Sequence, residues 1–182
     1  MRSAWARSDP RRVEQVDGDL FLGPFRVCCQ VVPGLSQASD SLTPDELFEN
    51  GFHAVVDVSH RRPDVSLELG RLFVWHPIPD AERLDDPGTI RLLARLVAGL
   101  VRSGRRVAVN CASGMNRSGL VVARALIELG YENEEAIRLV RRARGPDALA
   151  NRSFERWLRD EGASASGAKE EGAGPREPVG RT

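Results

Sequence analysis

Apolar residues recur along the chain with two different periods. Between residues 87 and 104 they return at helical spacing, which predicts a helix that buries one face. The same period predicts further helices over residues 118–129, 134–144 and 149–159. Short runs rich in β-branched residues predict strands between them, at residues 20–22, 26–31, 54–58, 72–75 and 106–109.

Two of the predicted helices carry clear start signals. Thr43, Pro44 and Glu46 fit an N-cap, a proline at the first helical position and a capping-box glutamate. Asp86 before Pro87 opens the helix that follows in the same way. Helices therefore alternate with strands along most of the chain.

This alternation predicts an α/β fold with one domain. The runs at 54–58 and 107–109 are almost continuously apolar, as in central strands covered on both faces, and we expect them to lie side by side. The prediction is a central mixed, mostly parallel sheet flanked by helices. We expect an N-terminal extension over residues 1–16, the folded domain over 17–160, and a disordered tail of small and charged residues over 161–182.

Charge and composition exclude several classes of protein. The 182 residues include 26 basic and 26 acidic side chains, so no nucleic-acid partner is expected. No apolar run is long enough to span a bilayer, and the start lacks the apolar segment of a signal peptide. We expect a cytoplasmic protein, without a membrane partner and monomeric. Three cysteines and three histidines without ligand spacing predict no disulfide framework, metal or cofactor.

The segment from Arg106 to Leu120 has the pattern of an anion-binding loop, a P-loop. A buried strand ends at Cys111, and residues 112–117 are small or flexible where a loop has to curl. Their backbone N–H groups, with the N-terminus of the next helix, can converge on one anion, for which we predict contacts from Ala112, Ser113, Gly114, Met115, Asn116 and Arg117.

Two side chains of this segment are suited to phosphate chemistry. The loop dipoles and the Arg117 guanidinium would stabilise Cys111 as a thiolate, the nucleophilic form of cysteine. Arg117 can bind a phosphate through two parallel hydrogen bonds. In an arginine-rich chain a cysteine and an arginine six residues apart also occur by chance, but the adjoining Ser118, the strand and the helix count against that reading.

Cysteine, five residues, arginine and serine resemble the signature of the protein tyrosine phosphatase superfamily. Residues 112–119 are most similar to its small dual-specificity branch. Weaker resemblance extends over residues 17–160: residues 19–23 are similar to that branch's opening strand, residues 54–59 to the strand before its acid loop, and residues 144–157 to its closing helix pair. The family's usual histidine before the cysteine is Asn110 here, which carries no charge and predicts slower turnover.

The resemblance implies a metal-free, cysteine-dependent phosphatase that hydrolyses phosphomonoesters through a cysteinyl phosphate. Asp80, 31 residues before Cys111, matches the family's general acid, with Asp85 and Asp86 as rivals. Asp86 also fits a helix N-cap. Ser118 would donate a hydrogen bond to the sulfur, or cap the helix, or both.

Phosphorylated proteins are the predicted substrates, with phosphotyrosine, phosphoserine and phosphothreonine all included. The loop positions Ala112, Ser113, Met115 and Asn116 are uncharged, whereas a polyphosphorylated inositol would favour lysines there. A phosphoinositide, a small phosphate ester, an RNA 5′-phosphate and a catalytically silent phosphate-binding module remain the alternatives.

Other candidate residues have plainer interpretations. Cys28 and Cys29 lie in an apolar run and fit buried packing thiols better than redox partners of Cys111. Arginines crowd one helix end, where the helix dipole and a solvated face explain them better than a docking patch. They are Arg138, Arg141, Arg142 and Arg144.

Overall fold

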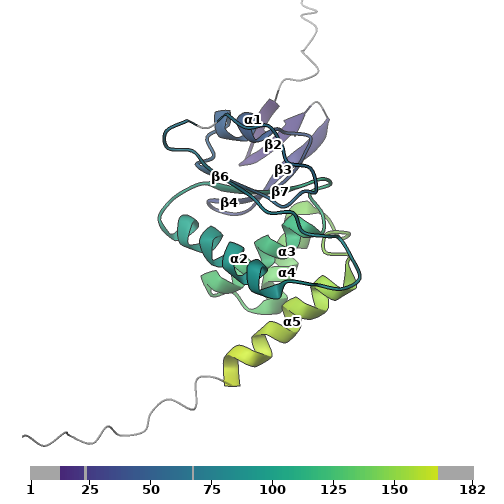
Figure 1. The fold of residues 1–182 in the computed structure, drawn as a ribbon. Helices are drawn as coiled ribbons and strands as arrows, with labels where there is room; N and C mark the ends of the chain where they lie inside the picture. Colours follow the sequence, from purple (N-terminus) through teal and green to yellow (C-terminus); the bar gives the residue numbers. More distant parts are fainter. Residues whose placement is uncertain (1–12, 23, 67, 168–182) are drawn as a thin grey trace, which may run out of the picture.

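A computed structural model describes residues 13–22, 24–66 and 68–167 of the chain (Figure 1). Seven strands form one sheet. They are β1 (Val13–Val16), β2 (Asp19–Leu22), β3 (Phe25–Val32), β4 (Leu35–Ser39), β5 (Ala54–Asp57), β6 (Leu72–Trp75) and β7 (Val107–Cys111). The helices are α1 (Pro44–Glu49), α2 (Pro87–Arg102), α3 (Arg117–Leu129), α4 (Asn133–Arg144) and α5 (Arg152–Gly167).

The sheet is mixed, with strand order β1-β2-β3-β4-β7-β5-β6. β1 to β4 pair in antiparallel fashion, whereas β4, β7, β5 and β6 pair in parallel. β5 and β7 are neighbours, as their apolar sequences predict. The carboxyl ends of the four parallel strands therefore meet at one edge, where an α/β sheet places its ligands.

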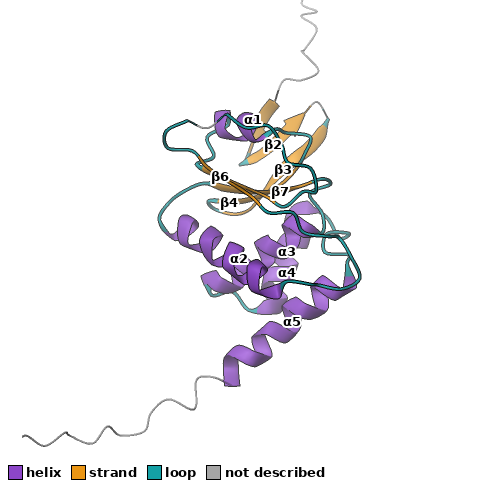
Figure 2. Cartoon of the chain, viewed as in Figure 1, coloured by secondary structure: helices purple, strands orange, loops and turns teal. Residues whose placement is uncertain are grey.

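Helices cover the two faces of the sheet unequally (Figures 1 and 2). α2, α3, α4 and α5 lie on one face, and the short α1 lies on the other. Val56 and Val109 point into the core under the larger helical layer, while Val55 and Ala108 point into the core under α1. Strands β5 and β7 are thus buried on both sides, which explains their continuous apolar character.

The predicted helix caps are present. The Thr43 hydroxyl accepts from the Glu46 N–H at 3.2 Å, and the Glu46 carboxylate accepts from the Thr43 N–H at 2.7 Å. At the start of α2, the Asp86 carboxylate accepts from the Thr89 N–H at 2.9 Å. Both caps satisfy backbone donors that a helix cannot pair internally.

The structure departs from the sequence-based boundaries at three places. β4 was not predicted. β1 lies within the predicted N-terminal extension, residues 1–16, and pairs with β2. α5 begins at Arg152 rather than residue 149 and continues through Gly167, past the predicted start of the tail. Residues 1–12 and 168–182, which hold the rest of both predicted terminal segments, lie outside the described residues.

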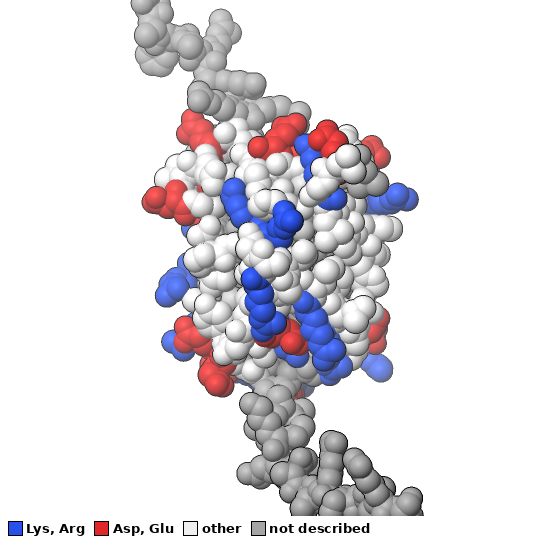
Figure 3. Space-filling model, turned by 90° about the vertical axis from the view of Figure 1, so that its left-hand side faces the viewer, with Lys and Arg blue, Asp and Glu red and all other residues white. Residues whose placement is uncertain are grey.

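None of the helices in the described part of the chain is both long and apolar enough to cross a bilayer. On the face shown in Figure 3, acidic and basic side chains are both present among uncharged residues, and in several places the two signs lie next to each other.

Candidate active site

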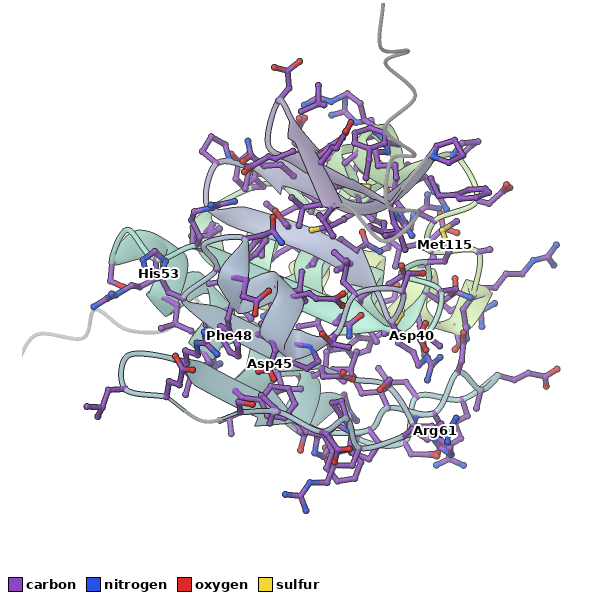
Figure 4. The ribbon with its side chains drawn as sticks, turned by 90° about the horizontal axis from the view of Figure 1, so that it is seen from above. Asp40, Asp45, Phe48, His53, Arg61 and Met115 are labelled. Atoms are coloured by element: carbon purple, nitrogen blue, oxygen red, sulfur yellow. The ribbon has the colours of Figure 1, made fainter. Side chains whose placement is uncertain are left out.

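Residues 111–117, here called the Cys111 loop, run from the last residue of β7 to the first residue of α3, at the carboxyl edge of the parallel strands. Figure 4 shows Met115 of this loop at the same end of the sheet as Asp40, which follows β4. His53, which precedes β5, lies at the opposite end. The topology therefore places the predicted anion-binding loop at the edge where the four parallel strands end.

Arg144, at the end of α4, donates hydrogen bonds to the backbone of the Cys111 loop and so holds it in place. Its Nε and Nη2 atoms donate to the carbonyl oxygens of Gly114 and Ser113, each at 2.9 Å. Its Nη1 donates to the Arg26 carbonyl at 2.9 Å, which ties the loop to β3. The expectation of a solvated arginine was therefore wrong for Arg144, whose guanidinium is used as a structural fork.

Gln37, in the middle of β4, supports the same loop from the sheet. Its side chain is fully buried, and Nε2 donates to the carbonyl oxygens of Gly114 at 2.9 Å and Met115 at 3.3 Å. Nε2 also donates to the Ser118 hydroxyl oxygen at 3.2 Å. A buried amide with this many loop contacts fixes the curl of the loop.

Every carbonyl oxygen from residue 112 to residue 116 accepts a hydrogen bond, four of them from other segments of the chain and that of Asn116 from the first turn of α3. Besides the bonds from Arg144 and Gln37, the Asp40 N–H donates to Ala112, the Leu149 N–H to Met115 and the Leu120 N–H to Asn116. None of the backbone N–H groups of residues 112–116 donates to another described residue. With the carbonyl groups bonded outward, these N–H groups are left for an anion.

Gly114 permits the tight curl of this loop. Its φ angle of +64° lies in the left-handed region, which a side chain disfavours. A Cβ at this position would lie 2.8 Å from the Ala38 carbonyl oxygen and 2.9 Å from Arg144 Nη2. Glycine is therefore required both by conformation and by close packing.

Cys111 and Ser118 form a buried pair beneath the loop. Both residues are fully buried, and Cys111 Sγ lies 3.2 Å from Ser118 Oγ. Because Gln37 Nε2 already donates to Ser118 Oγ, the Ser118 hydroxyl keeps its own proton for the sulfur. The structure thus brings together the predicted nucleophile and the predicted hydrogen-bond donor.

Arg117 begins α3 and is half-buried. Its Nε atom is buried and has no hydrogen-bond partner, and the side chain makes no ion pair within the described part of the chain. A buried guanidinium nitrogen without a partner is costly, so it is suited to receive an oxygen of a bound anion.

Asp80 lies in the loop between β6 and α2, residues 76–86, here called the Asp80 loop. One carboxylate oxygen accepts from Asn116 Nδ2 at 3.1 Å, and the other accepts from Asn151 Nδ2 at 2.9 Å. Asn116 belongs to the Cys111 loop, so Asp80 is held directly beside it. This side chain is exposed to solvent, as a proton donor to a substrate has to be.

The two rival carboxylates have other contacts. Asp86 caps α2, and the hydrogen bonds from Thr89 lower its pKa. Asp85 forms an ion pair with Arg83 at 3.7 Å. Neither is bonded to the Cys111 loop, so the geometry favours Asp80 among the three.

Asn110 ends β7 immediately before Cys111 and pairs with Asp57, its neighbour in the register of β5. Asn110 Nδ2 donates to Asp57 Oδ2 at 3.0 Å, while Asn110 Oδ1 is buried without a partner. Burial raises the pKa of Asp57 above its ordinary value, although hydrogen bonds from Ser59 and Asn110 oppose the shift. An uncharged amide thus stands beside a buried carboxyl group under the nucleophile.

Cys28 and Cys29 are both fully buried, as predicted for packing thiols. Burial raises the pKa of Cys28 to about 12, so it remains a neutral thiol. Cys29 Sγ lies 3.4 Å from Nη1 of Arg144, next to the brace of the Cys111 loop.

Comparisons with known proteins agree with this geometry. The family model described as "Dual specificity phosphatase, catalytic domain" matches residues 35–163, which is well over half of the chain. The chain therefore belongs to the dual specificity phosphatase family. This family membership confirms the resemblance found in the sequence and makes the domain a cysteine-based phosphatase domain. No curated protein sequence matches the chain.

Several solved structures share the fold. A mouse putative dual specificity phosphatase complexed with zinc tungstate superposes with a TM-score of 0.68 at 22% identity, covering 78% of this chain and 90% of that chain. Human DUSP28 gives 0.65 at 23% identity, covering 76% and 95%. Tk-PTP in the active form gives 0.56 at 26% identity, covering 72% and 92%.

The match to the dual specificity phosphatase family begins at residue 35, in β4, so residues 19–23, which resemble the family's opening strand in sequence, lie before the matched region. They form β2, one strand of an antiparallel run that extends the sheet before the matched region.

Sequence reasoning missed four residues that shape this site, namely Gln37, Arg144, Asn151 and Asp57. Gln37 sits in the unpredicted strand β4, and only the Pro33-Gly34 turn before it hinted at a second strand after β3. Asn151 carried a recognisable signal because an asparagine before a helical pattern is a common N-cap. It accepts from the Ser153 N–H at 3.1 Å.

Proposed function

We propose that this protein hydrolyses phosphotyrosine, phosphoserine and phosphothreonine in proteins, through a cysteinyl phosphate formed on Cys111. The observation that carries the proposal is the orientation of the Cys111 loop. Its carbonyl groups are bonded outward, its N–H groups have no partner among the described residues, and Arg117 Nε is buried beside it without one. These donors together suit the three terminal oxygens of a phosphoryl group.

In the first step, the Cys111 thiolate attacks phosphorus, so that a sulfur–phosphorus bond forms as the bond to the leaving oxygen breaks. Arg117 and the loop N–H groups stabilise the charge on the equatorial oxygens. Asp80 gives its proton to the leaving oxygen, because an alkoxide or phenoxide leaves poorly without one. The dephosphorylated hydroxyl product then departs.

In the second step, water attacks phosphorus and the sulfur–phosphorus bond breaks. Asp80, now a carboxylate, accepts a proton from the attacking water. The Ser118 hydroxyl, 3.2 Å from Sγ, donates to the departing thiolate. Inorganic phosphate leaves and Asp80 is again protonated for the next cycle.

The uncharged loop supports a phosphoprotein as the substrate. Ala112, Ser113, Met115 and Asn116 carry no charge, so beyond Arg117 the loop offers no cationic side chain for the further phosphates of an inositol head group. A phosphoamino acid presents one phosphoryl group, which the loop and Arg117 can satisfy alone.

Phosphate release from an aryl phosphate in the presence of a chelator tests the proposed chemistry. We expect turnover by the wild type and a loss of about 10⁴-fold or more in Cys111→Ser, because the nucleophile is removed. Cys28→Ala is the matched control, since it removes a buried cysteine from the core on the other side of the sheet. Near-normal turnover in Cys111→Ser would contradict the proposal, and a silent wild type would point to a phosphate-binding module.

The substrate class can be tested with the Cys111→Ser variant as a trap. We expect it to retain phosphopeptides carrying any of the three phosphoamino acids in preference to phosphoinositides and RNA 5′-phosphates. Preferential retention of a phosphoinositide would contradict the assignment to phosphoproteins while leaving the chemistry at Cys111 intact.

A further inference from the structure

An open cavity of about 690 Å³ adjoins the Cys111 loop. Asp80 and Asn116 form its wall toward the reacting groups, and Arg152 and Arg156 of α5 form part of the remaining wall. A single phosphoryl group is much smaller than this volume, which lies in the range of sites that hold a sizeable ligand. The cavity therefore has room for a part of the substrate beside the phosphorylated residue.

Arg152 and Arg156 lie one helical turn apart, and both are exposed. Neither forms an ion pair with another described residue. The next arginine along α5 differs, because Arg159 is bonded to Glu155 at 2.9 Å and to Glu134 at 2.9 Å. Like charges four residues apart on a helix repel each other, and an anion placed between them would turn this repulsion into attraction.

The carboxylates and the guanidinium groups of the cavity wall differ in their contacts. Asp80 and Glu82 are the two carboxylates. Both oxygens of Asp80 already accept hydrogen bonds, from Asn116 and Asn151. The guanidinium groups of Arg152 and Arg156, which form no ion pair with a described residue, are left to bind an anion.

We infer that this cavity binds a second anionic group of the substrate, a carboxylate or a second phosphoryl group on the same peptide as the phosphorylated residue. This inference rests on the proposed function and adds to it a preference for phosphopeptides with acidic flanks. Arg152 and Arg156 hold the anion, and Asn116 connects the cavity to the loop that holds the reacting phosphate.

Three phosphotyrosyl peptides of equal length test this inference. One has alanine flanks, one has glutamates on both sides, and one has a phosphoserine close to the phosphotyrosine. For the wild type we expect kcat/KM about tenfold higher for the acidic peptides than for the alanine peptide. In the Arg152→Gln/Arg156→Gln double variant this ratio should fall to about one, because both guanidinium groups are gone.

Arg105→Gln is the matched control, because Arg105 is an exposed arginine that precedes β7, at the opposite end of the strand from the Cys111 loop. It should keep the wild-type ratio. A higher ratio for the phosphoserine peptide assigns the cavity to a phosphoryl group, and a higher ratio for the glutamate peptide assigns it to a carboxylate.

A wild-type ratio near one would overturn the inference, as would a ratio that survives in the double variant, while hydrolysis of the alanine peptide would still support the proposed function. Failure of the wild type to hydrolyse any of the peptides would overturn the proposed function and this inference with it.

Discussion

The Cys111 loop and the Asp80 loop carry the two halves of the proposed chemistry, and the fold holds them in very different ways. The Cys111 loop is braced from two sides, by the buried amide of Gln37 and by the fork of Arg144. Asp80 is exposed and is held through the side chains of Asn116 and Asn151. The fold fixes the conformation of the Cys111 loop through buried and partly buried hydrogen bonds, whereas the proposed proton donor, Asp80, is held beside it by a few solvent-exposed hydrogen bonds.

This difference reflects what each half has to do. Stabilising a phosphoryl group requires dipoles that are already oriented before the reaction, because reorienting them would add to the barrier. A proton donor has to admit the substrate and then approach the leaving oxygen, which a loosely held loop allows. Substitutions in the Cys111 loop should therefore reduce activity more than substitutions that affect Asp80 or its hydrogen-bond partners.

Among substitutions that keep the nucleophile, the largest effect is expected for Arg117→Lys. Lysine keeps the charge but cannot form two parallel hydrogen bonds to phosphate, so kcat/KM for an aryl phosphate should fall by roughly 10³-fold or more. Arg105→Lys, the same replacement at an exposed site away from the loop, should leave kcat/KM unchanged. Near-normal activity in Arg117→Lys would show that the loop N–H groups suffice and that the guanidinium fork is dispensable.

Asp80→Asn should have the next largest effect, and its size should depend on the leaving group. We expect kcat/KM, which reports the first step, to fall by about 10²-fold for a phosphoserine peptide, whose leaving alkoxide needs a proton, and by less for a nitrophenyl phosphate. Asp85→Asn is the control because Asp85 lies in the same loop and pairs with Arg83, while no hydrogen bond joins it to the Cys111 loop among the described residues. An equal loss on both substrates would argue that Asp80 positions substrate and transfers no proton.

Asn151→Ser tests how Asp80 is held. Serine can still cap α5, as Asn151 does for Ser153 and Phe154, but it is too short to reach Asp80 and Ala81. We expect kcat to fall by roughly five- to tenfold, with little change in stability. Asn133→Ser removes an asparagine that bonds two carbonyl groups of α5, away from the site, and should spare kcat. An unaffected kcat in Asn151→Ser would mean that Asn116 alone holds the acid.

The smallest effect, on stability, is expected for a substitution of Asp57, which accepts a hydrogen bond from Asn110 immediately before Cys111. Burial raises its pKa, so between the ordinary aspartate pKa and this raised value the folded state binds more protons, and stability falls as pH rises through that window. Asp57→Asn removes the buried charge, and its new amide can donate to Asn110 Oδ1, which now has no partner. The free energy of unfolding should rise by about 1 kcal/mol at neutral pH and change less in acid.

Urea unfolding at a series of pH values would measure this effect. The exposed Asp64→Asn serves as control and should keep the wild-type pH dependence. A less stable Asp57→Asn protein with an unchanged pH dependence would show that the carboxylate is needed where it stands.

The two regions also differ in what the sequence could predict. The end of β7 and the start of α3 are local patterns, so Cys111, Arg117 and Ser118 could be assigned from neighbouring residues. The braces are not local. Gln37 reaches the loop from 77 positions earlier in the chain, and β4 is buried on both faces although it contains polar residues, so neither alternation nor an apolar run revealed it.

Arg144 shows the same limit on a helix. At the end of α4, among other arginines, its sequence context fits favourable contact with the helix dipole, which is a local interpretation. Its actual partners, Ser113 and Gly114, become neighbours only when α4 packs beneath the loop.

Asp80 was assigned through family resemblance, and its two asparagine partners come from segments on either side of α4.

The most direct test of the account is to look for phosphate on Cys111 itself. Asp80→Asn should slow the attack of water more than the departure of a good leaving group, so a nitrophenyl phosphate should load the enzyme. Acid quenching, digestion and mass spectrometry should then find phosphate on the peptide that contains Cys111. An unmodified Cys111 peptide during steady turnover, or phosphate on another residue, would contradict the account.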